Sequence, residues 1–192
     1  AYLAGNGISY YGDHSSAVLD EGADSRGDAL LTSVTRDWQA AADPAAEAGA
    51  RVCVLRTAPV MDRRAAPLKL LLPLFKAGLG ARLGDGSQYM PMISCRDWVA
   101  ATVHAAEHDT LSGPLNLVCP DVPTNAEFTQ ALASAVRRRA FFAAPAFLVD
   151  KAGGAMSGEV LGSMRTRPKA LEDAGFTFRD VDVRDVIATG LR

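Results

Sequence analysis

The chain has 192 residues, of which 48% are hydrophobic and 22% are charged, and its formal net charge is −2. This composition is typical of a globular protein of one domain or slightly more, and it excludes a disordered chain. Nucleic-acid binding needs a basic stripe, and a membrane span needs about 20 consecutive apolar residues. The sequence shows neither, so we expect no nucleic acid and no membrane as partner.

Three cysteines, Cys53, Cys95 and Cys119, are widely spaced along the chain. An odd number of dispersed cysteines is typical of reduced thiols, and no basic-then-apolar signal segment opens the chain. We therefore expect a cytoplasmic protein. The first residues, 2–10, already read as a strand with its exit loop, so we expect the sequence to begin inside a fold.

The stretch from residue 48 to residue 60 sets the fold class. Gly49 is placed to end a helix, because glycine enters the left-handed conformation without steric penalty. The run RVCVLR at 51–56 is apolar at adjacent positions, which is typical of a strand buried on both faces of a parallel sheet. Pro59 then ends the strand. In such sheets ligands bind at the carboxyl ends of the strands, here Thr57 to Val60.

Other elements follow from periodicity and from turn residues. We expect a helix broken at Asp43-Pro44, and a helix from Thr124, which forms a capping box with Glu127. Residues 153–162 receive no assignment. The expected strands are 2–10, 88–94, 115–119 and 176–178, and the expected helices are 30–48, 67–77, 96–108, 124–139, 146–152, 168–174 and 183–191.

Two motifs suggest chemistry that their context does not favour. The glycine-rich run at 78–84 follows a helix and precedes a strand, which is the reverse of the order that a dinucleotide-binding loop requires. His104, Glu107 and His108 match the H-x-x-E-H pattern of some zinc peptidases, but they fall in the last turn of a helix and no third ligand is evident. We predict a connecting segment for the first and no metal site for the second.

Several segments taken together resemble a known family. They are SYYGD, VTRDWQAAA, LRTAPVM, GDGSQYMPMIS, RDWVAATVHAAEH and PKALEDAGFTF. In this order they are similar to the carboxyl-terminal two-thirds of an atypical extended short-chain dehydrogenase/reductase of the sugar-epimerase-like subgroup. The resemblance runs from Tyr2 almost to Arg192.

The resemblance implies an α/β fold, a Rossmann-like doubly wound parallel sheet with a smaller α+β substrate domain. Residues 1–120 would form the carboxyl-terminal part of the cofactor domain, with 62–94 contributing to the substrate region, and 121–192 would bind substrate. The cofactor would be NADP or NAD, held mainly by a phosphate loop that this chain does not contain. Family members also act on small-molecule substrates, and a homodimer is one expected assembly.

The same resemblance assigns roles to residues. Ser9 and Tyr11 would be catalytic, while Gly7, Ile8, Thr57, Ala58, Pro59 and Val60 would contact the cofactor, and Arg82, Gln88, Tyr89, Met90 and Arg165 would contact substrate. Typical members place a serine where Asn6 and Gly7 stand, and they carry a tyrosine and a lysine on the helix that here reads Leu31 to Thr35. That pair is missing here, as it is in the atypical subgroup.

Two functions remain open from the sequence. One is an NAD(P)-dependent oxidoreductase or epimerase that acts on a nucleotide-sugar-like or other small polar substrate. The other is a non-catalytic cofactor-binding or scaffold protein that kept the fold after losing the tyrosine and the lysine. A metallohydrolase at His104 and His108 is the weakest alternative.

Overall fold

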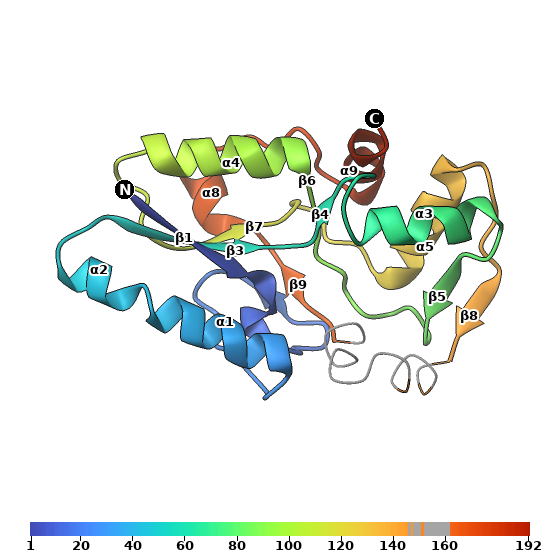
Figure 1. Cartoon of the computed structure of the whole chain (residues 1–192), viewed down its shortest axis with the longest axis horizontal. Coiled ribbons are helices and arrows are strands. Elements are labelled where there is room, and N and C mark those ends of the chain that lie inside the picture. Colours follow the sequence, from blue (N-terminus) through green and yellow to red (C-terminus); the bar gives the residue numbers. More distant parts are fainter. Residues whose placement is uncertain (146, 148–150, 152–161) are drawn as a thin grey trace.

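The computed structural model describes residues 1–145, 147, 151 and 162–192 (Figure 1). Its centre is a parallel sheet of β1 (Tyr2–Gly7), β3 (Val52–Thr57) and β7 (Gly113–Leu117), in the order β1-β3-β7. Residues 52–56 are all buried, and β3 has a parallel neighbour on each side. The prediction that RVCVLR is a central buried strand is therefore confirmed.

Helices cover both faces of this sheet. On one side lie α1 (Leu30–Ala40) and α2 (Asp43–Glu47), and on the other lie α4 (Cys95–Glu107) and α8 (Lys169–Asp173) (Figure 1). Side chains of β3 alternate between the two layers: Val52 and Val54 pack against Ala42, while Cys53 and Leu55 pack with residues of α4 and β7. Two buried layers on one parallel sheet confirm the doubly wound α/β fold.

The other end of the molecule is built around three helices, α3 (Leu68–Lys76), α5 (Asn125–Ala135) and α9 (Val183–Gly190). Their shared core contains Leu72, Phe75, Phe128, Leu132 and Ile187. Three short pairs of parallel strands complete this end and the region between it and the central sheet. They are β4 (Val60–Met61) with β6 (Ile93–Ser94), β5 (Ala81–Leu83) with β8 (Phe142–Ala144), and β2 (Val18–Leu19) with β9 (Arg165–Thr166).

The expected boundary at residue 120 stays a prediction. Elements on the two sides of this boundary pack together, since α3 contacts α5 and α8 contacts β7. The expected helix at 146–152 and the unassigned stretch 153–162 lie, apart from residues 147, 151 and 162, outside the described residues.

Several boundaries differ from expectation for local reasons. The strand expected at 88–94 is reduced to β6 and a single antiparallel bridge between Tyr89 and Thr124, which is formed by hydrogen bonds from the Met90 amide to the carbonyl of Pro123 and from the Asn125 amide to the carbonyl of Gln88. Residues 176–178 form no strand, and Phe176 and Phe178 instead pack edge to face against each other and against the sheet core. The helix at Thr124 ends at Ala135, ahead of Arg137, whose φ is 57°.

Two local predictions are confirmed. Gly49 has φ 86°, as expected of a glycine that ends a helix. The capping box at α5 is present, with the Thr124 hydroxyl accepting from the Glu127 amide while the Glu127 carboxylate accepts from the Thr124 amide.

None of the helices described here is both long and apolar enough to cross a membrane.

Candidate functional site

The carboxyl ends of the three sheet strands lie side by side. Gly7 of β1 is in register with Thr57 of β3, which is in register with Leu117 of β7. The amide of Ala58 then donates to the carbonyl of Leu117 at 3.0 Å. Ligands of parallel α/β sheets bind at this edge, because the loops that leave the strands form a crevice there.

The residues predicted to contact a cofactor all lie at this edge. Gly7 ends β1, and a Cβ built on it would lie 3.2 Å from the methyl group of Thr35, so α1 approaches the strand closely. Ile8 and Ala58 are buried, and Pro59 is exposed. Thr57 accepts a 3.3 Å hydrogen bond from the indole of Trp98. The structure brings the predicted set together, and its role in binding stays a prediction.

Tyr11, predicted to be catalytic, is fully buried in the short helix η1 (Ile8–Tyr11). Its hydroxyl donates to Asn116 Oδ1 at 2.8 Å and accepts from Arg56 Nη1 at 2.7 Å. Burial raises the pKa of Tyr11, although Arg56 acts in the opposite direction. A phenol enclosed in this way is held as a structural group in this conformation. Ser9, in the same short helix, is only half-buried and is the more accessible predicted hydroxyl.

Arg56 is the centre of a buried polar network that sequence reasoning missed. Its guanidinium donates to Gln39 Oε1 of α1 at 2.8 Å and to the carbonyl of Glu21 at 3.2 Å, and it stacks 3.6 Å from the centre of the Tyr10 ring. The Glu21 carboxylate accepts from the Asn116 amide at 3.0 Å, and burial raises its pKa. An arginine within an otherwise apolar strand was the available signal, because a buried charge requires partners.

The residues predicted to contact substrate fall into two groups. Arg165 stacks on Tyr89, with its guanidinium carbon 4.8 Å from the ring centre. Gln88 donates to the carbonyl of Leu83 at 3.2 Å, while Met90 Sδ accepts from Asn125 at 3.3 Å. Arg82 projects into solvent from β5. The structure therefore pairs Tyr89 with Arg165 and holds Gln88 and Met90 against β5 and α5.

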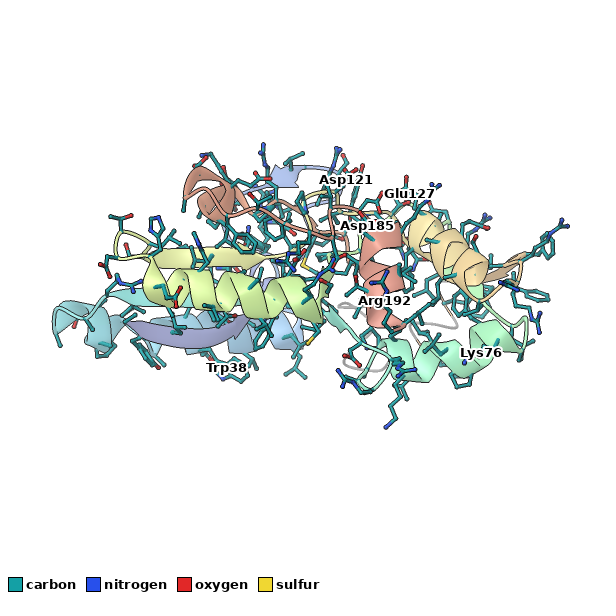
Figure 2. All side chains as sticks on the ribbon, turned by 90° about the horizontal axis from the view of Figure 1, so that it is seen from above. Trp38, Lys76, Asp121, Glu127, Asp185 and Arg192 are labelled. Carbon is teal, nitrogen blue, oxygen red and sulfur yellow. The ribbon has the colours of Figure 1, made fainter. Side chains whose placement is uncertain are left out.

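Tyr89 and Arg165 are among the residues that line a groove between α5 and α9. The groove has a volume of about 960 Å³, and its apolar wall includes Val122, Ala131 and Ile187. Asp121, Glu127 and Asp182 lie along its rim. Figure 2 shows Asp121 and Glu127 on the same side of the molecule as Asp185.

The two histidines of the H-x-x-E-H run lie together on α4, with ring centres 5.0 Å apart. His104 also packs against Phe176. Within the described part of the chain, no three His, Cys, Asp or Glu side chains are close enough to hold a metal ion. The run at 78–84 was predicted to be a connecting segment, and this is only partly correct, because its residues 81–83 form the short strand β5, which pairs with β8.

The parallel sheet, its two helical layers and its aligned strand ends define a doubly wound, Rossmann-like α/β protein. A family model described as a domain of unknown function (DUF1731) matches residues 144–189. The epimerase family protein ML0860 of Mycobacterium leprae is 40% identical over 97% of this chain, and the human epimerase family protein SDR39U1 is 32% identical over 80% of it. The chain is thus a relative of the epimerase family proteins, which confirms the predicted resemblance.

Two solved structures support the same relationship. The crystal structure of human SDR39U1 with NADPH matches 98% of this chain with a TM-score of 0.88 and 27% identity. A nucleoside-diphosphate sugar epimerase from Corynebacterium glutamicum matches 98% of it with a TM-score of 0.80 and 33% identity. The chain spans 61% of the M. leprae protein and 52% of the human protein in the sequence matches.

Proposed function

We propose that this chain is the part of an NAD(P)-dependent, epimerase-like oxidoreductase that receives the nicotinamide end of the cofactor and the substrate. The observation that carries the proposal is the register of Gly7, Thr57 and Leu117, which puts three strand ends and their loops at one edge. Relatives named as epimerases, one of them solved with NADPH, support NADP or NAD as the cofactor.

The residues at this edge fit a nicotinamide ring better than they fit phosphates. Gly7, Thr57, Ala58 and Pro59 are small and uncharged, so a flat ring can approach the backbone closely. Phosphate binding uses consecutive backbone amides at a helix amino terminus or cationic side chains. We therefore assign Gly7, Ile8 and residues 57–60 to the nicotinamide end and leave the phosphates to residues outside this chain.

When bound, the cofactor would take up a hydride from a substrate carbon or return one to it. The matching proton must move at the substrate oxygen, and Ser9 Oγ is the predicted hydroxyl best exposed for this step. Tyr11 is the second residue proposed to be catalytic, but in this conformation its hydroxyl is hydrogen-bonded to Asn116 and Arg56.

A nucleotide-sugar-like or other small polar substrate is the proposed class. Tyr89 offers an aromatic face and Arg165 a guanidinium that can pair with an anionic group. Arg82, Gln88 and Met90 complete the proposed substrate set.

A non-catalytic cofactor-binding or scaffold protein is the second candidate. Two observations favour it: Leu31 to Thr35 contain neither tyrosine nor lysine, and Tyr11 is enclosed. This candidate predicts that the cofactor binds but that its redox state and the substrate do not change.

Calorimetric titration of the protein at its native length with NADPH and with NADH tests the shared claim. We expect saturable binding of at least one nucleotide, and no binding of either would overturn both candidates. Turnover of nucleotide sugars then separates the two. An enzyme should lose turnover in Ser9→Ala while keeping its affinity for the cofactor, whereas a scaffold should show no turnover in either form.

A further inference from the structure

Basic residues are concentrated in two segments of this acidic chain. Residues 63–84 and 128–147 contain eight of the 20 basic residues and none of the 22 acidic ones. The eight are Arg63, Arg64, Lys69, Lys76, Arg82, Arg137, Arg138 and Arg139. The net charge of −2 therefore conceals a strong local excess of positive charge.

The fold brings these two segments together at one end of the molecule. Strand β5 of the first pairs with β8 of the second, with Ala81 in register with Phe142. Arg138 Nε donates to the carbonyl of Lys76 at the end of α3, at 2.9 Å. Figure 1 shows α3, β5 and β8 together at the end farthest from the sheet.

Large apolar side chains are exposed on the same end. Phe141 and Phe142 are 78% and 56% exposed, and Leu79 is 59% exposed. Leu70 and Leu74 are also exposed, and they lie one turn apart on α3. We call the following set the tip surface: Lys69, Leu70, Leu74, Lys76, Leu79, Arg137, Arg138, Arg139, Phe141 and Phe142.

We propose that the tip surface binds an anionic membrane surface. Exposed phenylalanine and leucine side chains can enter the boundary between headgroups and acyl chains, while the cations beside them contact anionic headgroups. Large exposed apolar side chains that gather at one end of a molecule are typical of an interaction surface. Because neither segment contains a carboxylate, an anionic partner meets no repulsion from these residues.

Nucleic acid fits this surface less well. Phenylalanine rings can stack on bases, but three exposed leucines gain no partner from a nucleic-acid strand. The proposal also revises the expectation of no membrane partner, which rested on the overall charge and on the lack of an apolar span. It concerns surface attachment only, since none of the described helices can cross a bilayer.

Co-sedimentation of the protein at its native length with lipid vesicles tests the proposal. We expect binding to vesicles of equal parts phosphatidylcholine and phosphatidylglycerol, and little binding to phosphatidylcholine alone. Phe141→Ser combined with Phe142→Ser should weaken binding about tenfold or more, because two buried rings are lost. Arg137→Glu combined with Arg139→Glu should also weaken it, and added salt should weaken the wild type.

The controls come from other parts of the chain. Trp38→Ser removes an exposed apolar side chain from α1, and Arg192→Glu reverses an exposed charge at the last residue; both should bind as the wild type does. Thermal unfolding followed by circular dichroism checks that each variant folds. If the Phe141/Phe142 variant fails to fold, Leu70→Gln combined with Leu74→Gln takes its place.

Three outcomes would overturn the proposal. The first is no preference for anionic vesicles, and the second is unchanged binding in the folded tip variants. The third is a different occupant of the tip surface. A second copy of the chain is that occupant if sedimentation velocity shows self-association that the same variants abolish. Nucleic acid is that occupant if a single-stranded oligonucleotide displaces the vesicles at equal phosphate concentration.

Discussion

Arg56 donates a 2.7 Å hydrogen bond to the hydroxyl of Tyr11, and both side chains are buried. Through this contact the central strand β3 holds the short helix that follows β1. Asn116 of β7 and Gln39 of α1 bond to the same pair. The short helix η1, which carries Ser9, is therefore fixed to β3, β7 and α1.

Replacing Arg56 should destabilise the fold strongly. Arg56→Met keeps much of the side-chain volume but leaves Gln39, the Tyr11 hydroxyl and the Glu21 carbonyl without their donor. We expect the free energy of unfolding, measured with urea, to fall by about 3 kcal/mol. Arg26→Met, which removes an exposed cation, should change it by less than about 0.5 kcal/mol. Equal effects of the two variants would contradict the network.

Glu21 should make stability depend on pH. Burial raises its pKa above the usual value of 4.5, so the folded state binds this proton more tightly than the unfolded state. The stability that Glu21 contributes is therefore present below about pH 4.5 and is lost as the pH rises through the raised pKa of the folded state. Glu21→Gln cannot titrate.

The measurement is the difference in free energy of unfolding between the wild type and Glu21→Gln. We expect the advantage of the wild type to shrink as the pH is raised from about 4 to about 7. Glu47→Gln, on the exposed side of α2, is the matched control. If this difference grows with pH instead, folding does not raise the pKa of Glu21, and the prediction is wrong.

Asp97 should be essential for joining α4 to the segment before α9. Its buried carboxylate accepts from the amides of Arg179 and Asp180, at 3.1 and 2.8 Å. Asp97→Ala leaves both amides without an acceptor, so we expect it to lower the free energy of unfolding by about 3 kcal/mol. Asp109→Ala, at an exposed position, is the control. A loss at Asp97 no larger than at Asp109 would refute this role.

The three cysteines should differ in reactivity. Burial raises the pKa of the Cys119 thiol to about 12 and also raises the pKa of Cys53, while Cys95 is only half-buried. Since the thiolate is the reactive form, an aromatic disulfide reagent at about pH 8 should label native Cys95 first. Cys95→Ser should remove the fast phase and Cys119→Ser should leave it. A fast phase that survives in Cys95→Ser would exclude this order.

The sheet could be predicted because its signals are local. The run RVCVLR, the glycine at residue 49 and the helix with Trp98 each follow from residues close in sequence. The ends of elements were less predictable where a distant partner decides them, as when residues 89 and 90 pair with residues 123 and 124 in one isolated bridge.

The candidate site likewise has features that the sequence predicts and features that it does not. Gly7 and Thr57 could be placed at one edge, because parallel strands align their carboxyl ends. The enclosure of Tyr11 could not be foreseen, because its partners Arg56 and Asn116 lie 45 and 105 residues away in sequence. The stacking of Arg165 on Tyr89 likewise depends on packing between distant segments.

The most direct test of the central claim is a crystal structure of the protein at its native length with NADPH or NADH bound. We predict that the nicotinamide ring contacts Thr57 to Val60 and lies beside Gly7. A nicotinamide bound away from the carboxyl ends of β1 and β3 would contradict the account.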